Sequence, residues 1–143
     1  MEASGDMAIV KPRLIKATIK NTAFALTLLL AACAPQRDTS TPAQLLIGHW
    51  LQDNENGRVH FCFSKNGVHT IRNENDGTIN QFSYTIGTQY TKKKALEFST
   101  DPRDRRIARF SKDGNTAEIT LLPLEKPYTT WKYVDTDTEK CGG

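Results

Sequence analysis

The stretch that decides the fold is residues 58–68, which read Arg58-Val59-His60-Phe61-Cys62-Phe63-Ser64-Lys65-Asn66-Gly67-Val68. Bulky apolar side chains occupy every second position up to Phe63, which is the period of a strand that buries one face. Asn66 and Gly67 both tolerate the positive φ angles of a tight hairpin turn. Val68 to Arg72 then returns as the partner strand. The segment therefore predicts a β-hairpin.

Similar short strands follow at a spacing of eight to twelve residues, separated by turns rich in Gly, Pro, Asn or Asp. We expect eight strands, at or near residues 49–53, 58–63, 68–72, 78–86, 96–98, 105–110, 117–121 and 131–133. Such regular spacing is typical of an antiparallel barrel or sandwich joined as a meander. Eight strands also suffice to close a small barrel. Thr41 followed by Pro42 predicts a short helix before the first strand, because Thr caps helices and Pro suits the first helical position.

The strand pattern also predicts the interior of the barrel. The side chains expected to point inward are Trp50, Val59, Phe61, Phe63, Phe82, Tyr84, Ile86, Leu96, Phe98, Ile107, Ile119, Leu121 and Trp131. Strands this short enclose a space that side chains largely fill. We therefore expect a packed core or a small cleft, not a deep fatty-acid cup.

The N-terminal 32 residues have the pattern of an export signal. A basic region, with Lys11, Arg13, Lys16 and Lys20, precedes the uncharged run 22–32. Those eleven residues make roughly 16 Å of helix, about half of what a membrane span needs but enough for a signal-peptide core. Because Glu2 and Asp6 fit a basic region poorly, Met7 is an alternative start.

The run ends in Leu30-Ala31-Ala32-Cys33, which resembles the lipobox of bacterial lipoproteins. The resemblance implies that residues 1–32 are removed and that Cys33 carries the lipid and becomes the mature N-terminus. Two or three acyl chains hold a protein firmly at a membrane. Ala34, in place of Asp, favours the outer membrane by the enterobacterial sorting rule. The expected location is the cell envelope, in the periplasm or outside the cell.

Processing divides the remaining chain and changes its charge. We expect a lipidated N-terminus and flexible tether over 33–42, a barrel domain over 43–135 and a flexible tail over 136–143. Loss of four basic and two acidic residues with the signal leaves 15 basic and 14 acidic residues, so the net charge falls from +3 to +1. A body so nearly neutral does not indicate nucleic-acid binding. We expect a monomer.

Gly48-His49-Trp50, after a short helix and before a strand meander, resembles the Gly-x-Trp motif of lipocalins and small lipocalin-like proteins. The segments 63–67 and 110–114 are similar to a Phe, polar, Asn/Asp-Gly hairpin common in bacterial lipocalin-like domains. The resemblance covers about residues 43–134. It implies a closed barrel end marked by Gly48 and Trp50, with a late basic residue, Lys132 or Arg109, over the tryptophan.

The three cysteines divide between the anchor and the barrel. With Cys33 lipidated, Cys62 and Cys141 form an even pair in an oxidising compartment. A bridge between them would close a loop of about eighty residues and stabilise the fold by roughly 4 kcal/mol. The alternative is that Cys141, close to the chain end, never meets Cys62.

Two further groups of side chains are candidate sites. His60 and Cys62 share one strand face and His69 lies on the partner strand, a set with the donor types of a zinc site. Exposed polar strand positions are the favoured interpretation, so no metal or cofactor is expected. Four arginines surround one turn and form either an interaction surface or a solvated rim: Arg103, Arg105, Arg106 and Arg109.

No motif of nucleophilic, metal-dependent or phosphate chemistry occurs in the sequence, so we expect no enzyme. The first functional hypothesis is a binding module for a small hydrophobic ligand or lipid at the open end of the barrel. The second is an inhibitor, immunity or assembly factor that contacts another protein through loops 73–77, 87–94 and 101–105. The placement of Cys62 and Cys141 loosely resembles that of periplasmic lysozyme inhibitors, small barrels on lipoprotein anchors.

Overall fold

Nine antiparallel strands form one sheet in residues 36–124 and 126–142, the part of the chain that the computed structural model describes. The strands are β1 Gly48–Asn54, β2 Gly57–Phe63, β3 Val68–Asn73, β4 Ile79–Ser83, β5 Thr85–Tyr90, β6 Ala95–Asp101, β7 Asp104–Phe110, β8 Thr116–Leu121 and β9 Pro127–Asp135. The helix α2 (Pro42–Leu46) precedes them, and short 3₁₀ helices occupy η1 (Thr91–Lys93) and η2 (Glu139–Cys141). The expected all-β fold with a short leading helix is confirmed.

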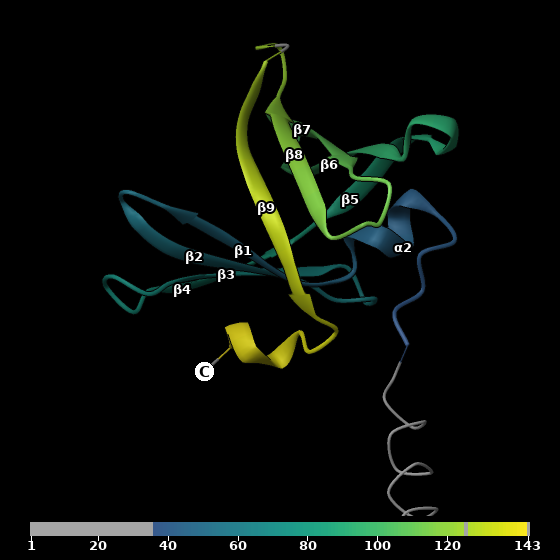
Figure 1. Cartoon of the computed structure of the whole chain (residues 1–143). Coiled ribbons are helices and arrows are strands. Elements are labelled where there is room, and N and C mark those ends of the chain that lie inside the picture. The colour runs from purple at the N-terminus through teal and green to yellow at the C-terminus, as the bar shows by residue number, and fades with distance from the viewer. Residues whose placement is uncertain (1–35, 125, 143) are drawn as a thin grey trace, which may run out of the picture. The chain divides into compact units, whose positions relative to one another are not determined.

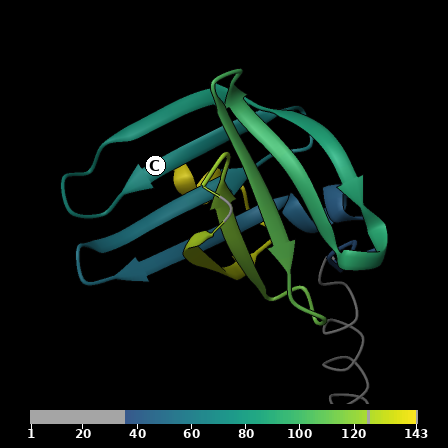
Figure 2. The same ribbon diagram turned by 90° about the horizontal axis from the view of Figure 1, so that it is seen from above.

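The sheet closes through its first and last strands. Its order is β4-β3-β2-β1-β9-β8-β7-β6-β5, so every strand pairs with its sequence neighbour except β4 with β5, and β9 lies between β1 and β8 (Figure 1). The strands curve around a common interior, as the view from above shows (Figure 2). The result is a nearly closed, lipocalin-like meander barrel.

The predicted strand over 78–86 is wrong in one respect, because the chain breaks its pairing at Tyr84. The Tyr84 amide donates to the carbonyl of Gly67 at 2.9 Å, and its hydroxyl donates to the carbonyl of Ser64 at 2.8 Å. Before this anchor β4 pairs only with β3, and after it β5 pairs only with β6. One bent segment therefore counts as two strands, which explains nine strands in place of eight.

Aromatic side chains fill the centre of the barrel. Trp50, Phe63 and Trp131 are fully buried, and Phe61 stacks on Trp131 with ring centroids 4.3 Å apart. Of the thirteen predicted inward side chains, eight are buried: Trp50, Phe61, Phe63, Tyr84, Leu96, Phe98, Ile119 and Trp131. The packed core agrees with the expectation from strand length.

Five of the predicted inward side chains are not fully buried: Val59 and Leu121 are half-buried, and Phe82, Ile86 and Ile107 do not lie in the core. Phe82 and Ile86 flank the break at Tyr84 and are 43% and 36% exposed. Ile107 points to the outer face, since the register places its neighbour Ala108 between Leu96 and Ile119, all three fully buried. Alternation therefore puts Arg106, and not Ile107, inside.

Contacts among the described residues extend beyond the predicted domain 43–135 at both ends. On the N-terminal side, Arg37 donates to the carbonyl of Gly114 at 2.7 Å and to that of Leu45. At the other end Cys141 is completely buried. Most of the described part of the expected tether and of the expected flexible tail thus contacts the barrel.

Candidate functional site

The two ends of the barrel differ. Connections β2–β3, β5–β6 and β7–β8 lie at the end that α2 covers, where the Lys94 ammonium donates to the carbonyl of Lys112 at 2.6 Å. We call this the closed end. Connections β1–β2, β3–β4, β6–β7 and β8–β9 lie at the opposite end, which we call the open end.

Trp50 marks the closed end, as the Gly-x-Trp motif implies. Its indole nitrogen donates to the carbonyl of Leu46 in α2 at 2.8 Å. Gly48 has a φ of +127°, and a Cβ at this position would lie 2.7 Å from the Tyr133 ring, so the motif requires glycine. The hydrogen bond from Trp50 thus joins β1 to α2 at the closed end.

The cation over the tryptophan is Arg37, and not Lys132 or Arg109 as the resemblance suggested. Its guanidinium carbon lies 4.9 Å from the centre of the Trp50 ring and 3.5 Å from that of Tyr133. Such contacts contribute about 0.5–2 kcal/mol each. Burial lowers the pKa of Arg37, and the nearby Tyr133 opposes that shift. Residues before the barrel therefore form part of its closed end.

His69 lies inside the barrel and is completely buried. Its ring stacks on Phe63, with centroids 4.1 Å apart, and faces Phe82 at 6.4 Å. Neither ring nitrogen has a hydrogen-bond partner among the described residues. Burial, and then the charge of Arg106, lower the pKa of His69 to about 3, so the imidazole is neutral. A buried polar group without a partner is costly, so His69 is the least satisfied polar side chain of the described core.

Arg106 and Asp104 form an ion pair that points toward the barrel interior. Arg106 Nε and Asp104 Oδ1 are 3.0 Å apart, and the second nitrogen–oxygen pair is at 2.7 Å. The Arg106 side chain is 20% exposed, and in register it lies between the buried Phe98 and Leu121. Both charges act on His69, so the three groups share one region.

Partly exposed apolar side chains surround this region. Phe82 lies opposite His69 on the neighbouring strand, and Ile86 lies opposite Phe98. The large apolar side chains that remain exposed on the described chain are Ile79, Phe82, Ile86, Tyr90, Leu124, Tyr128 and Val134. Phe82 and Ile86 sit beside the gap between β4 and β5, where the barrel wall has two free strand edges among the described residues.

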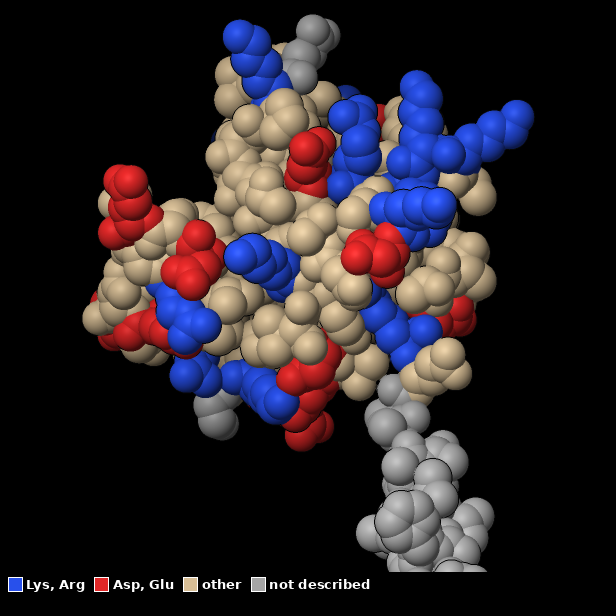
Figure 3. Space-filling view, viewed as in Figure 1, with Lys and Arg blue, Asp and Glu red and all other residues tan. Residues whose placement is uncertain are grey.

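The four predicted arginines do not form one surface. Arg105 and Arg109 point outward and pair with Glu97 at 2.8 Å and Glu118 at 4.0 Å, whereas Arg106 points inward. Arg103, 92% exposed, lies on the β6–β7 turn. Basic side chains gather over the part of the barrel near β5 to β7, with acidic side chains between them (Figure 3). Strand alternation thus divides the cluster into an outer rim and one interior residue.

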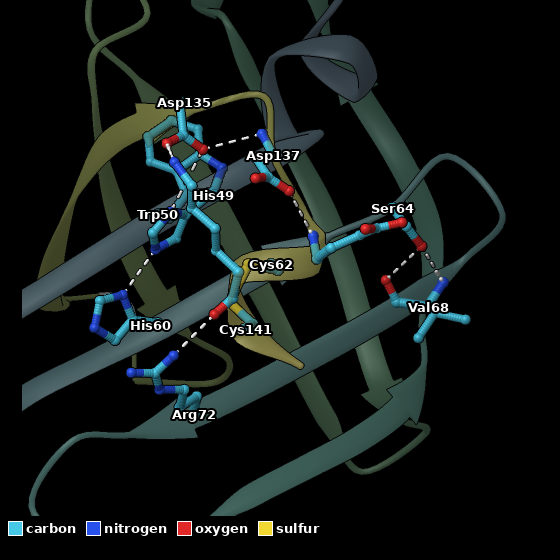
Figure 4. The surroundings of a disulfide bond; sticks show 12 residues. His49, Trp50, His60, Cys62, Ser64, Val68, Arg72, Asp135, Asp137 and Cys141 are labelled. Atoms are coloured by element: carbon cyan, nitrogen blue, oxygen red, sulfur yellow. Dashed lines mark hydrogen bonds and ion pairs between the residues drawn. A yellow bond between two sulfur atoms is a disulfide. The ribbon is translucent and has the colours of Figure 1, made fainter. Parts of the chain in front are cut away.

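Cys62 and Cys141 form a disulfide bond, with an S–S distance of 2.04 Å, that ties η2 to the outer face of β2 (Figure 4). Arg72 strengthens the attachment by donating to the carbonyl of Lys140 at 3.0 Å. The bond closes a loop that spans 79 positions, which contributes about 4 kcal/mol in the chain-entropy description.

A row of two imidazoles and two carboxylates lies beside the disulfide. His49 Nε2 is 2.7 Å from His60 Nδ1, and His60 Nε2 is 2.5 Å from Glu74 Oε1. At the other end His49 Nδ1 is 3.5 Å from Asp135 Oδ1. Burial lowers the pKa of His49, the charge of Asp135 raises it and His60 lowers it further. The hydrogen bond from His60 lowers the pKa of Glu74.

The set His60, Cys62 and His69 is not brought together, because His69 points into the barrel and the other two point outward. His49 takes the place of His69 beside the cysteines. His49 was not predicted as a possible ligand, because the Gly-x-Trp motif concerns only Gly48 and Trp50. An inward Trp50 nevertheless implies that the neighbouring His49 points outward. Arg37 and Glu74 carried no comparable signal in the sequence.

The predicted lipidation residue, Cys33, lies outside the described residues. Among the residues that are described, no helix is both long and apolar enough to cross a membrane.

Compared with models of protein families, with curated proteins and with solved structures, the chain matches none. The geometry of the barrel is therefore the basis for its proposed function.

His69 makes stability depend on pH. An unfolded histidine takes up a proton near pH 6.5, whereas buried His69 stays neutral down to about pH 3. The contribution of His69 to the free energy of unfolding is therefore fully present above pH 6.5, and it falls as the pH drops below that value. We expect a loss of about 2 kcal/mol from His69 between pH 7.5 and 5, measured by urea unfolding. His69→Phe should remove that part of the slope, and an unchanged slope in this variant would contradict the assignment.

Proposed function

We propose that this protein is a membrane-anchored envelope lipoprotein whose barrel is a non-enzymatic binding module for a small hydrophobic ligand or lipid. The observation that carries the proposal is His69, which is fully buried with two unpartnered ring nitrogens beneath partly exposed apolar side chains. A neutral imidazole both donates and accepts hydrogen bonds. A ligand with one polar end and an apolar body suits this arrangement.

The region beside the gap between β4 and β5 supplies both kinds of contact. Phe82 and Ile86 offer apolar surface beside the gap in the barrel wall. Arg106 offers a guanidinium on a side chain that is 20% exposed, and Asp104 holds it in place through two hydrogen bonds. Since charge-assisted hydrogen bonds are strongest away from water, a carboxylate or phosphate on the ligand would bind best near Arg106. Lipids with an anionic headgroup and fatty acids both have this chemistry.

The anchor proposed at Cys33 fits the position of Arg37. Four residue steps separate the two, so an extended chain reaches at most about 14 Å between them. Arg37 is bound at the closed end. An acylated Cys33 would therefore hold the closed end near the membrane and leave the open end facing away.

A second candidate function is contact with another envelope protein through the open end. It is favoured by the connection from β8 to β9, where Leu124 and Tyr128 are 61% and 49% exposed. Capture of an envelope protein that is lost in Leu124→Glu, without any binding of lipid, would favour this role over the first.

Binding of oleate tests the proposed module. We expect the purified protein to bind oleate in isothermal titration calorimetry, and Arg106→Gln to bind it about 10- to 100-fold more weakly, because hydrogen bonds to charged groups contribute about 1.5–3 kcal/mol. Arg105→Gln is the matched control: it lies next to Arg106 but points outward, so affinity should change less than about twofold. Absence of oleate binding, or equal losses in both variants, would reject the module.

Palmitate labelling tests the anchor separately. We expect label in the wild-type protein and its loss in Cys33→Ser, because the thiol is the acceptor of the lipid. Cys62→Ser should keep the label, since Cys62 is bonded to Cys141. Label that persists in Cys33→Ser would contradict lipidation at this residue.

A further inference from the structure

The outer face of β1 and β2 brings three possible metal ligands together, with a fourth, His60, in contact with one of them. His49 lies directly opposite Cys62 in the strand register, and His60 precedes Cys62 by two residues on the same face. Cys141 reaches this face from η2 (Figure 4). One ligand atom each from His49, Cys62 and Cys141 lies within 4.8 Å of the others, and His60 Nδ1 is 2.7 Å from His49 Nε2.

Two neutral imidazoles carry too few protons to make every hydrogen bond in the row of His49, His60, Glu74 and Asp135. Glu74 accepts, so His60 Nε2 donates to it, and a neutral His60 then accepts at Nδ1 from His49 Nε2. A neutral His49 has no second proton for Asp135. In agreement, His49 Nδ1 is buried without a hydrogen-bond partner among the described residues, 3.5 Å from the Asp135 carboxylate. Without a metal, the row of His49, His60, Glu74 and Asp135 has one proton fewer than its contacts require.

A metal ion between the imidazoles would satisfy every contact with no change in proton number. His49 would carry its proton on Nδ1 and donate to Asp135, while His60 continues to donate to Glu74. The lone pairs of His49 Nε2 and His60 Nδ1 would then point at the metal. Histidine ligands of metals characteristically donate their other ring N–H to a carboxylate, which fixes the tautomer and the ring orientation.

We propose that reduction of the Cys62–Cys141 disulfide creates a Zn²⁺ site with His49, His60, Cys62 and Cys141 as ligands, so that the disulfide and the bound metal are alternative states of one site. Two imidazoles and two thiolates are a common tetrahedral zinc set. With bonds of about 2.0–2.1 Å to nitrogen and 2.3 Å to sulfur, the nitrogens must be about 3.3 Å apart and the sulfurs about 3.8 Å. The nitrogens need to separate by less than 1 Å from their 2.7 Å. Cys141, near the chain end, supplies the larger movement of the sulfurs.

The redox step balances with a dithiol as reductant. The dithiol gives two electrons and two protons to the Cys62–Cys141 bond and becomes a disulfide, and the S–S bond is replaced by two S–H groups. Binding of Zn²⁺ then releases both thiol protons to solvent. In the reverse direction a disulfide takes two electrons from the two thiolates and two protons from solvent and becomes a dithiol; Cys62 and Cys141 form their S–S bond, and the metal is released because a disulfide has no thiolate to offer.

Co²⁺ is the probe for this site, because its absorption reports tetrahedral geometry and thiolate bonds. The protein is the full chain with Cys33→Ser, in detergent, so that Cys62 and Cys141 are the thiols present. After reduction with a dithiol and its removal without oxygen, we expect one Co²⁺ per chain with thiolate charge-transfer bands, displaced by Zn²⁺. The oxidised protein should lack these bands.

Variants identify the ligands. His49→Ala and His60→Ala should each weaken Co²⁺ binding by more than about 100-fold, and Glu74→Gln by about 10- to 100-fold, as loss of a carboxylate behind a ligand does. His69→Phe is the matched control, because this third histidine points into the barrel, and it should bind Co²⁺ as the parent does. Unchanged affinity in both alanine variants would overturn the proposal.

Two further results would also overturn it. One is a reduced chain that stays folded by circular dichroism and shows no thiolate bands with Co²⁺. The other is a reduced chain that unfolds and does not regain its β signal when Zn²⁺ is added. Neither result bears on oleate binding, which depends on the opposite face of the strands.

Discussion

Pairing between β1 and β9 is the constraint on which the rest of this structure depends. Because β4 and β5 do not pair, the strands would form two separate sheets, β4 to β1 and β9 to β5, without the pairing of β1 with β9. Here Trp50 lies opposite Tyr133 and Leu51 opposite Lys132, while the register shifts between His49 and Trp50. Gly48 permits this junction because Tyr133 packs where a side chain would be. The aromatic core, the covering helix and the disulfide all lie against these two strands.

Alternation along the paired strands separates two chemistries. Inward positions carry the aromatic core and, beside the gap between β4 and β5, the unpartnered His69 with Arg106 and Asp104. Outward positions one residue away carry His49, opposite Cys62. A proposed lipid-binding interior and a proposed redox-dependent metal site are thus separated by the thickness of one sheet. The side chains that carry the two proposals therefore lie on opposite faces of the sheet.

Much of the fold could be predicted from local sequence, because a period of two and turn residues are local properties. The hairpin around Asn66-Gly67 and the helix start at Thr41 needed no distant information. The break at Tyr84 could not be predicted, because it depends on hydrogen bonds to Ser64 and Gly67 in the turn between β2 and β3. The same holds for Arg106: a one-residue difference in register decides whether it or Ile107 points inward.

The candidate sites were harder to predict than the fold. The pairing of Cys62 and Cys141 could be predicted from the number of cysteines. The approach of His49 and Asp135 to the disulfide depends on the closure of the barrel. Arg37 belongs to a segment whose composition indicates a tether, and its contacts with Trp50 and Tyr133 arise only after α2 has packed. Chemistry-bearing residues are visible in a sequence, whereas their partners are set by tertiary structure.

Amide hydrogen exchange tests the closure of the barrel most directly. If β1 and β9 seal the sheet, the amides of Trp50, Leu51, Lys132 and Tyr133 should exchange slowest, near the rate of global unfolding. Amides of β4 that face its free edge should exchange many times faster, since that edge has no strand partner among the described residues. Equal rates in the two places, or faster exchange at the β1–β9 pair, would contradict this closure.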